Sequence, residues 1–189
     1  MCASPLHRRP PQSEPQARSD PRTQSDPRDL TPKRSPWVTS VSTVFPHHAN
    51  PLGTAFGGYV LELLDVNAAI ACFRFARTQV VTASTEPVDF RNPVHVGEIA
   101  EVRSRVIWTG RTSMIVRCEL TAEDAFSGER RLCTIGHLNF VALDADGRPT
   151  PVPPLLVESD EESAHWAEGE RVRAAILKRR KASSSANDC

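Results

Sequence analysis

The 189-residue sequence lacks a net charge, because its 23 lysine and arginine residues equal its 23 aspartate and glutamate residues. Such a balance gives no overall electrostatic attraction to nucleic acids or to anionic membranes. We therefore expect neither a nucleic acid nor a membrane as a partner. The length predicts one domain with tails.

Long apolar runs are also absent. Glu62, Asp65 and Arg74 interrupt the longest one, so it falls short of the roughly 18 uncharged residues of a membrane span. The N-terminus has no apolar region typical of a secretory signal, and its acidic residues argue against an organelle transit peptide. We expect a cytoplasmic protein.

Several motifs of common active sites are missing. The five cysteines are odd in number and form no C-x-x-C pair, which indicates reduced thiols and argues against a disulfide framework or a zinc site. There is no G-x-G-x-x-G loop, no P-loop and no G-x-S-x-G elbow. His47 and His48 are adjacent, and adjacent side chains rarely bind one ion together, so we expect no metal site.

Proline is concentrated at one end of the chain. Residues 1–36 hold eight of the sixteen prolines and almost no large apolar side chains, so they cannot bury enough surface to offset the entropy of ordering. We predict a disordered arm over 1–36, a folded domain over 37–157, and a C-terminal helix with a basic tail over 158–189. The helix, expected over 163–181, is predicted to be solvated.

The folded part is predicted to be α+β. An apolar helix, capped by Thr54, is expected over 54–77. Pro87 suggests that the strand around it lies at a sheet edge or contains a bulge. The expected strands are 37–45, 80–90, 99–108, 112–124 and 131–144.

Two of these strands alternate clearly between apolar and polar residues, as half-buried strands do. Because the helix is apolar nearly all round, the sheet should wrap around it, and a second subunit should complete the enclosure. The side chains predicted to face the helix are Ala100, Val102, Ser104, Val106 and Trp108 on the first strand, and Met114, Val116, Cys118 and Leu120 on the second.

Two polar residues could carry chemistry. Asp65 lies near the middle of the apolar helix, where a carboxylate is costly unless it is paired, hydrogen-bonded or functional. It could bond a backbone amide or Arg74, or it could act as a general base on a water molecule. Asn50 could form an Asx turn before Pro51, or its amide could position that water or a substrate carbonyl. The residues alone leave both choices open.

Two glycine-containing segments could bind anionic groups. Gly57 and Gly58 open the helix, where free N–H groups and the helix dipole could bind an oxyanion, although close helix–strand packing would also explain them. The segment Gly110–Ser113 is either an ordinary turn or a phosphate contact through Arg111. The basic cluster 178–181 has the same two interpretations, of which a solvated helix face is favoured.

Four segments resemble the acyl-CoA thioesterases of the hot-dog fold. They are HANPLGTAFGGYVLELLD (48–65), VVTASTEPVDFRNPVHVGE (80–98), GRTSMIVRCEL (110–120) and LNFVALDADGRPTPVPPL (138–155). They follow the family's order, and the resemblance covers roughly residues 40–155. It implies an α+β hot-dog fold, in which an antiparallel sheet wraps a long central helix. It also implies an enzyme that hydrolyses acyl-CoA to a carboxylic acid and CoA.

The resemblance implies roles for individual residues. Asn50 and Asp65 would act in catalysis across a dimer interface, and Gly57 and Gly58 would polarise the thioester carbonyl. No cofactor is implied apart from the coenzyme A of the substrate, and the assembly is a homodimer, often a trimer of dimers. The expected substrate-binding residues are Phe56, Thr82, Gly110, Arg111, Thr112 and Ser113, the last four near CoA.

One position departs from the family. Members often carry an acid two residues before the loop asparagine, whereas this chain has His48, which puts the electrostatics of the loop in question. An (R)-specific enoyl-CoA hydratase of the same fold is disfavoured, because its Asp-x-Asn-Pro-x-His motif is met here only by Asn50 and Pro51. A non-catalytic acyl-CoA-binding module is the other alternative, and it would need no acid at position 65.

Overall fold

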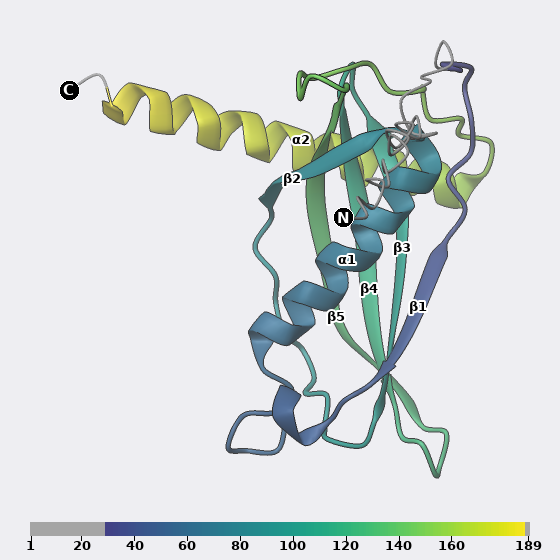
Figure 1. Ribbon diagram of the computed structural model, residues 1–189, viewed down its shortest axis with the longest axis vertical. Helices are drawn as coiled ribbons and strands as arrows, with labels where there is room; N and C mark the ends of the chain where they lie inside the picture. Colours follow the sequence, from purple (N-terminus) through teal and green to yellow (C-terminus); the bar gives the residue numbers. More distant parts are fainter. Residues whose placement is uncertain (1–28, 188–189) are drawn as a thin grey trace, which may run out of the picture.

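The computed structural model describes residues 29–187, with side chains as far as residue 183. The α+β class predicted from the sequence is confirmed. In chain order (Figure 1), the elements are β1 (Val38–Thr43), the short 3-10 helix η2 (Pro46–His48), α1 (Gly57–Ala76), β2 (Gln79–Thr85), β3 (Ile99–Thr109), β4 (Ser113–Glu123), β5 (Arg130–Leu143) and α2 (Asp160–Asn187).

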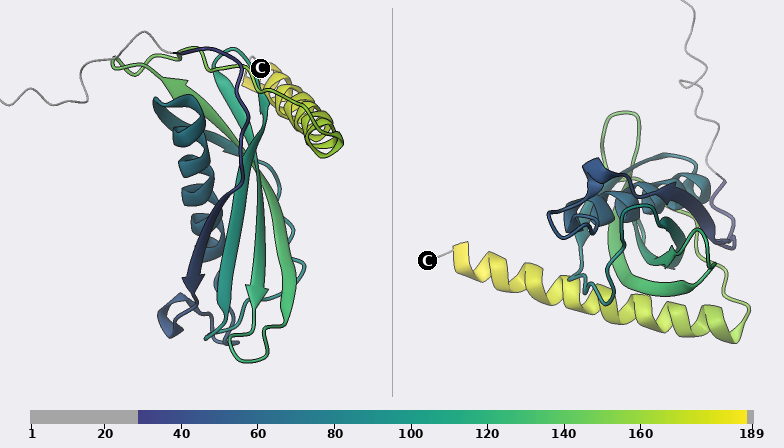
Figure 2. Two further views of the ribbon diagram at one scale, coloured as in Figure 1. Left: turned by 90° about the vertical axis from the view of Figure 1, so that its right-hand side faces the viewer. Right: turned by 90° about the horizontal axis from the view of Figure 1, so that it is seen from below.

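The five strands form one antiparallel sheet in the order β1-β3-β4-β5-β2. The sheet curls around α1, and α2 crosses its opposite side (Figure 2). We call the side toward α1 the inner face and the side toward α2 the outer face. The prediction that β2 lies at an edge is confirmed, although the strand ends at Thr85, before Pro87, and is bulged between Thr82 and Ser84.

The main core lies between α1 and the inner face. Strand alternation directs one set of apolar side chains from β3, β4 and β5 toward the helix, as predicted for the segment 112–124. The predicted wrapping of the sheet around the helix is therefore confirmed. The buried core residues include Val60, Leu64, Ala68, Ala71, Cys72 and Phe75 of α1, and Val102, Val106, Met114, Val116, Cys118, Leu120, Leu138 and Phe140 of the sheet.

The prediction for Trp108 is wrong. The register between β3 and β4 shifts between Val106 and Trp108, where a β-bulge inserts an extra residue into β3. Beyond the bulge the side chains change faces, so Trp108 packs on the outer face with Ile107 and Ile115, next to Trp166 of α2. A pattern with a period of two residues cannot reveal such an insertion.

Helix α2 begins at a capping box. The Ser159 hydroxyl accepts a hydrogen bond from the Glu162 N–H (3.2 Å), and the Glu162 carboxylate accepts one from the Ser159 N–H (3.3 Å). The prediction of a solvated helix is wrong for the part up to Ile176, because Ile176 is buried and Trp166 and Val172 pack over the sheet. The last turns of α2 extend beyond the sheet (Figure 1).

The outer face also holds buried charge. Arg105, predicted to face solvent, is only 7% exposed and forms an ion pair with Glu162 of α2 at 3.0 Å. Donation from the Glu158 N–H, together with bonds from Arg34 and Arg105, lowers the pKa of Glu162 to about 2. The Arg105 guanidinium also lies over the ring of Trp37, 5.3 Å from its centroid. These contacts attach α2 to β3.

Part of the arm that was predicted to be disordered is hydrogen-bonded to the folded domain. Residues 1–28 of the predicted arm lie outside the described residues. Lys33, however, donates its N–H to the carbonyl of Pro154 (3.1 Å), and the buried Ser35 hydroxyl accepts from the Val106 N–H (2.9 Å). The arm is ordered here because it supplies partners to buried backbone groups of the sheet. Within residues 29–187, no helix is long and apolar enough to span a membrane.

Candidate active site

The loop before α1 holds Asn50 through local hydrogen bonds. Its Oδ1 accepts from the Leu52 N–H (2.9 Å), which is the Asx turn that the sequence allowed. Its Nδ2 donates to the Thr54 hydroxyl (2.9 Å). An amide nitrogen carries two N–H donors, so the second one remains available to a ligand. The Asx turn and a role for the amide are therefore compatible.

The start of α1 differs from the prediction. Phe56, and not Thr54, is the residue that precedes the first helical residue, and no side chain caps this end. The Thr54 hydroxyl is instead bonded to Asn50. The first N–H groups of a helix have no partner inside the helix, so those of Gly57 and Gly58 are open to an anionic group.

Neither packing nor backbone strain requires glycine at position 58. A Cβ atom at Gly58 would meet nothing within 4 Å, and Gly58 is not among the residues with positive φ. A Cβ atom at Gly57 would lie 3.4 Å from the ring of Phe90, an ordinary contact. Close helix–strand packing therefore does not explain Gly58. Phe56, which precedes the pair, is half exposed beside it.

Asp65 lies on the side of α1 that faces edge strand β2. The Thr82 hydroxyl donates to Asp65 Oδ1 at 2.7 Å, so two residues predicted separately, as catalytic and as substrate-binding, are in direct contact. Asp65 is half-buried, whereas its neighbour Leu64 is fully buried. Among the described residues no ion pair joins Asp65 to Arg74. The carboxylate is thus held at the boundary between the apolar core and solvent.

Asn50 and Asp65 do not meet within one protomer. Asn50 precedes the helix, and Gly57 and Asp65 are separated by roughly 12 Å along the helix axis. In the part of the chain that the structure describes, no hydrogen bond joins the loop to the Asp65 carboxylate. One protomer therefore presents these two groups at separate places.

His48 packs against the first turn of α1. Its ring stacks on Tyr59 (3.8 Å between centroids, 13° between planes), and its Nδ1 accepts from the Phe45 N–H at 3.2 Å. Partial burial, and then the neighbouring His47, lower the pKa of the His48 imidazole. A neutral His48 thus stands at the position where the resembling family often carries an acid.

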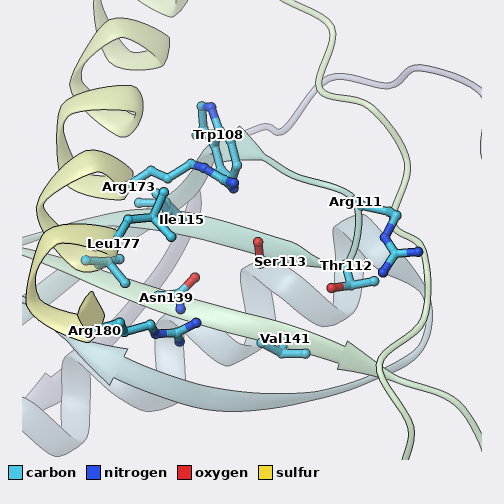
Figure 3. A pocket seen from close by; sticks show the side chains of 11 residues that line it. Trp108, Arg111, Thr112, Ser113, Ile115, Asn139, Val141, Arg173, Leu177 and Arg180 are labelled. Atoms are coloured by element: carbon cyan, nitrogen blue, oxygen red, sulfur yellow. The ribbon is translucent and has the colours of Figure 1, made fainter. Parts of the chain in front are cut away.

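The turn Gly110–Ser113 lies elsewhere, on the outer face. Arg111, Thr112 and Ser113 line a cavity of about 250 Å³ between this turn and α2 (Figure 3). We call this cavity the outer pocket. A Cβ atom at Gly110 would come within 2.8 Å of the Trp108 ring, so the turn can cross that ring only with glycine here. Neither Phe56 nor Thr82 lines the outer pocket.

The sequence interpretation missed three further polar residues of the outer pocket. Asn139 of β5 and Arg173 and Arg180 of α2 line it together with the turn. Arg180 belongs to the cluster 178–181, for which a solvated helix face was favoured. Nothing in the local pattern identifies these residues, because the docking of α2 on the sheet brings them together.

The described residues contain no cluster of at least three histidine, cysteine, aspartate or glutamate side chains that could hold a metal ion. His95 and His137 are isolated in sequence, and His137 is bonded to Glu168 of α2 at 2.9 Å. The polar groups that the sequence predicted for catalysis lie in the loop, at the start of α1 and at Asp65, which contacts Thr82.

Comparisons with known proteins agree on one family. A family model described as "Thioesterase superfamily" matches residues 52–125. The protein named uncharacterized acyl-CoA thioester hydrolase YkhA, from Bacillus subtilis, is 39% identical over 125 residues, which are 66% of this chain and 73% of that protein.

Solved structures of related proteins are similar as well. An apo hexameric acyl-CoA thioesterase has a TM-score of 0.75 at 35% identity, covering 81% of this chain and 99% of that chain. The acyl-CoA hydrolase of Staphylococcus aureus, solved with butyryl coenzyme A and coenzyme A, has a TM-score of 0.73 at 33% identity, covering 80% and 93%. Three further structures of the Staphylococcus aureus protein carry alanine in place of an asparagine, an aspartate or a threonine.

Proposed function

Because the chain belongs to the hot-dog-fold acyl-CoA thioesterases and is a thioester hydrolase, we propose that it cleaves acyl-CoA to a free carboxylic acid and CoA with Asp65 as the general base. The observation that carries this proposal is the hydrogen bond from the Thr82 hydroxyl to Asp65 (2.7 Å). It fixes the carboxylate through one oxygen and leaves acceptor capacity for a water molecule.

The Staphylococcus aureus variants support the same three residues. The asparagine, aspartate and threonine that are replaced there are spaced 15 and 17 positions apart. Asn50, Asp65 and Thr82 follow one another in the same order and at the same two spacings. We therefore propose that Asn50 and Thr82 act with Asp65, Thr82 as the residue that positions its carboxylate.

In the proposed reaction, Asp65 takes a proton from water while the water oxygen attacks the thioester carbonyl carbon. The carbonyl oxygen becomes an oxyanion, which the N–H groups of Gly57 and Gly58 bind at the positive end of the helix dipole. The carbon–sulfur bond then breaks, and the CoA thiolate takes the proton back from Asp65. Water, substrate and these side chains balance the reaction without a cofactor.

We further propose that Asn50 of the partner subunit completes each site. The apolar side chains of Leu61, Val66 and Phe73 on α1 and of Val81 on β2 are between 39% and 53% exposed. Exposed apolar side chains next to a sheet edge are typical of an interface. A copy paired through β2 would bring the loop of one subunit toward α1 of the other. The hexameric relatives suggest a trimer of such dimers.

The test is an acyl-CoA panel with thiol detection of released CoA. Asp65→Asn is expected to lower kcat by a factor of about 10²–10⁴, as loss of a general base does. Thr82→Val should lower kcat less, and Thr82→Ser should restore it because the hydroxyl returns. A native-like rate for Asp65→Asn would sink the proposed mechanism, and no hydrolysis by the native protein would favour a binding module.

Subunit mixing tests the composite site. Asp65→Asn and Asn50→Ala are each expected to be weakly active, but mixed oligomers of the two should regain activity. Each mixed dimer would hold one site in which both residues are native. If mixing restores nothing, although mass spectrometry shows that mixed dimers form, Asn50 and Asp65 do not act across subunits.

A further inference from the structure

His48 departs from the pattern of the resembling family, and the proposed reaction gives it no role. Its imidazole Nδ1 accepts the Phe45 N–H at 3.2 Å. A neutral imidazole has one acceptor nitrogen and one N–H, so the proton of the neutral ring is on Nε2. A protonated imidazole has two donors and no acceptor. The ring can therefore bond the Phe45 N–H only in its neutral state.

The backbone of His48 closes the loop that carries Asn50. The Phe56 N–H donates to the His48 carbonyl at 2.9 Å, so the loop begins at His48 and ends directly before Gly57. Inside the loop, the Asn50 N–H donates to the Thr54 carbonyl at 2.8 Å. Asn50 and the N–H group of Gly57 thus have a common anchor in His48.

The His48 ring also joins this loop to the first turn of α1. It stacks on the Tyr59 ring, with 3.8 Å between the centroids and 13° between the planes. The Tyr59 hydroxyl in turn shares a hydrogen bond of 3.1 Å with the Ser42 hydroxyl of β1. A displacement of the His48 ring would therefore disturb the start of α1, where the proposed oxyanion is bound.

The groups around His48 favour its neutral form. Partial burial, and then the adjacent His47, lower the pKa of the imidazole, whereas the Glu62 carboxylate of α1 opposes them. The positive end of the α1 dipole also disfavours a cation beside the first turn, while the Tyr59 ring would attract one. The net result is a pKa below the ordinary histidine value of about 6.5.

We infer that His48 is a positioning residue whose neutral ring holds the Asn50 loop and the first turn of α1 in the arrangement that the reaction needs. The inference rests on the proposed function for the reaction that is affected, but the coupling between His48 and the loop can be measured without it. Protonation removes the acceptor of the Phe45 N–H and adds a positive charge beside the helix start. Hydrolysis should therefore slow as the pH falls through the lowered pKa of His48.

The first experiment compares pH profiles of kcat for the native protein and three variants. Native kcat should fall about two- to tenfold below about pH 6.5, the effect of losing one hydrogen bond. In His48→Asn the amide oxygen can accept from Phe45 at any pH, so this variant should keep most of the activity near pH 7.5 and lack the fall. His48→Phe keeps a ring for Tyr59 but has no acceptor, so its kcat should be low at every pH.

His47→Asn is the matched control, because His47 is the exposed neighbour and does not accept the Phe45 N–H. It should keep the native fall in kcat. The midpoint should move slightly closer to the ordinary histidine value, because His47 no longer lowers the pKa of His48.

The second experiment is an NMR titration of the full-length protein, which needs no turnover. The His48 imidazole should titrate with a midpoint below about 6.5. The amide signals of Phe45 and Asn50 should change with the same midpoint, and this change should be absent in His48→Asn. Thermal melts followed by circular dichroism show whether each variant is folded.

The results decide the inference. If the fall in kcat persists unchanged in His48→Asn, or if a folded His48→Phe is as active as the native protein, His48 does not position the site. If the Phe45 and Asn50 signals do not follow the His48 titration, the inference is wrong whatever the activity. If the signals follow it but the native protein hydrolyses no acyl-CoA, the proposed function fails while the coupling of His48 to the loop stands.

Discussion

The two faces of the sheet are each covered by one helix, but the two contacts are opposite in character. On the inner face, α1 packs residues such as Leu64 and Cys72 against apolar strand residues. On the outer face, α2 packs Trp166 beside Trp108 and adds ion pairs such as that between Arg117 and Glu168, 2.6 Å long. The contact of α1 is mainly apolar packing, whereas the contact of α2 combines apolar packing with ion pairs.

The difference shows that the two faces of one sheet can present different groups, apolar side chains on the inner face and many charged side chains on the outer face. The inner face buries one side of α1, and Asp65 lies half-buried at the margin of that side, held by the Thr82 hydroxyl. The outer face tolerates many charges because carboxylates from α2 neutralise the arginines of the strands. The residues that line the outer pocket include Arg111, Arg173 and Arg180 but no carboxylate.

The largest effect is expected from breaking the buried charge on the outer face. Arg105→Ala would remove a charged hydrogen bond to the buried Glu162 carboxylate and leave Arg34 as its remaining cation, which should lower the free energy of unfolding by about 1.5–3 kcal/mol. Urea denaturation measures it. The control is Arg103→Ala on the same strand, whose pair with Glu119 (2.7 Å) is partly exposed and should be worth about 0.2–1 kcal/mol. Equal losses of unfolding free energy in Arg105→Ala and Arg103→Ala would contradict the distinction between the buried and the exposed ion pair.

A smaller effect is expected where α2 approaches the sheet most closely. A Cβ atom at Gly169 would come within 2.4 Å of the Trp108 Cβ, so Gly169→Ala should cost about 1–3 kcal/mol through overpacking. In a solvated helix the same change would stabilise by about 1 kcal/mol, because alanine favours helix. The sign of the change in Tm therefore decides whether α2 is docked in solution. Glu170→Ala, at the next and exposed position, should have little effect.

The smallest change in the free energy of unfolding is expected from protonation of Glu162 at low pH. The folded-state pKa of Glu162, about 2, lies below the ordinary glutamate value, so the charged carboxylate stabilises the fold above about pH 4.5 and this contribution is lost as the pH falls toward 2. The Glu162→Gln variant lacks the contribution. The difference in unfolding free energy between native protein and variant should be greatest near pH 6 and should shrink on acidification. A constant difference across that range would show that Glu162 is not the group responsible.

The inner face could be predicted from the sequence because its signal is local. Met114, Val116, Cys118 and Leu120 alternate along one strand, and a helix that is apolar nearly all round must be enclosed. The loop asparagine and the helix acid could be singled out for similar reasons, since each residue type is unusual in its setting. Their catalytic roles remain predictions that the variants above will test.

The outer face could not be predicted because its signal is tertiary. The polar side of β3 looks solvated until Glu162, far along the chain, is placed opposite Arg105. The bulge that turns Trp108 outward adds one residue without changing the composition of the strand. Asn139 belongs to β5, whereas Arg173 and Arg180 belong to α2, so the three become a group only after α2 docks.

The strand order has a consequence for how the chain folds. β2 is the second strand in the sequence. Within the described residues it pairs only with β5, the last strand. Pairing between distant segments is slow because a long loop must first be closed. Until β5 is available, β2 lacks the strand with which it pairs, so we expect the contact of Thr82 with Asp65 to need the last strand of the sheet. A nascent chain whose β5 segment is still inside the ribosome would contain α1 and Asp65, but not the completed site.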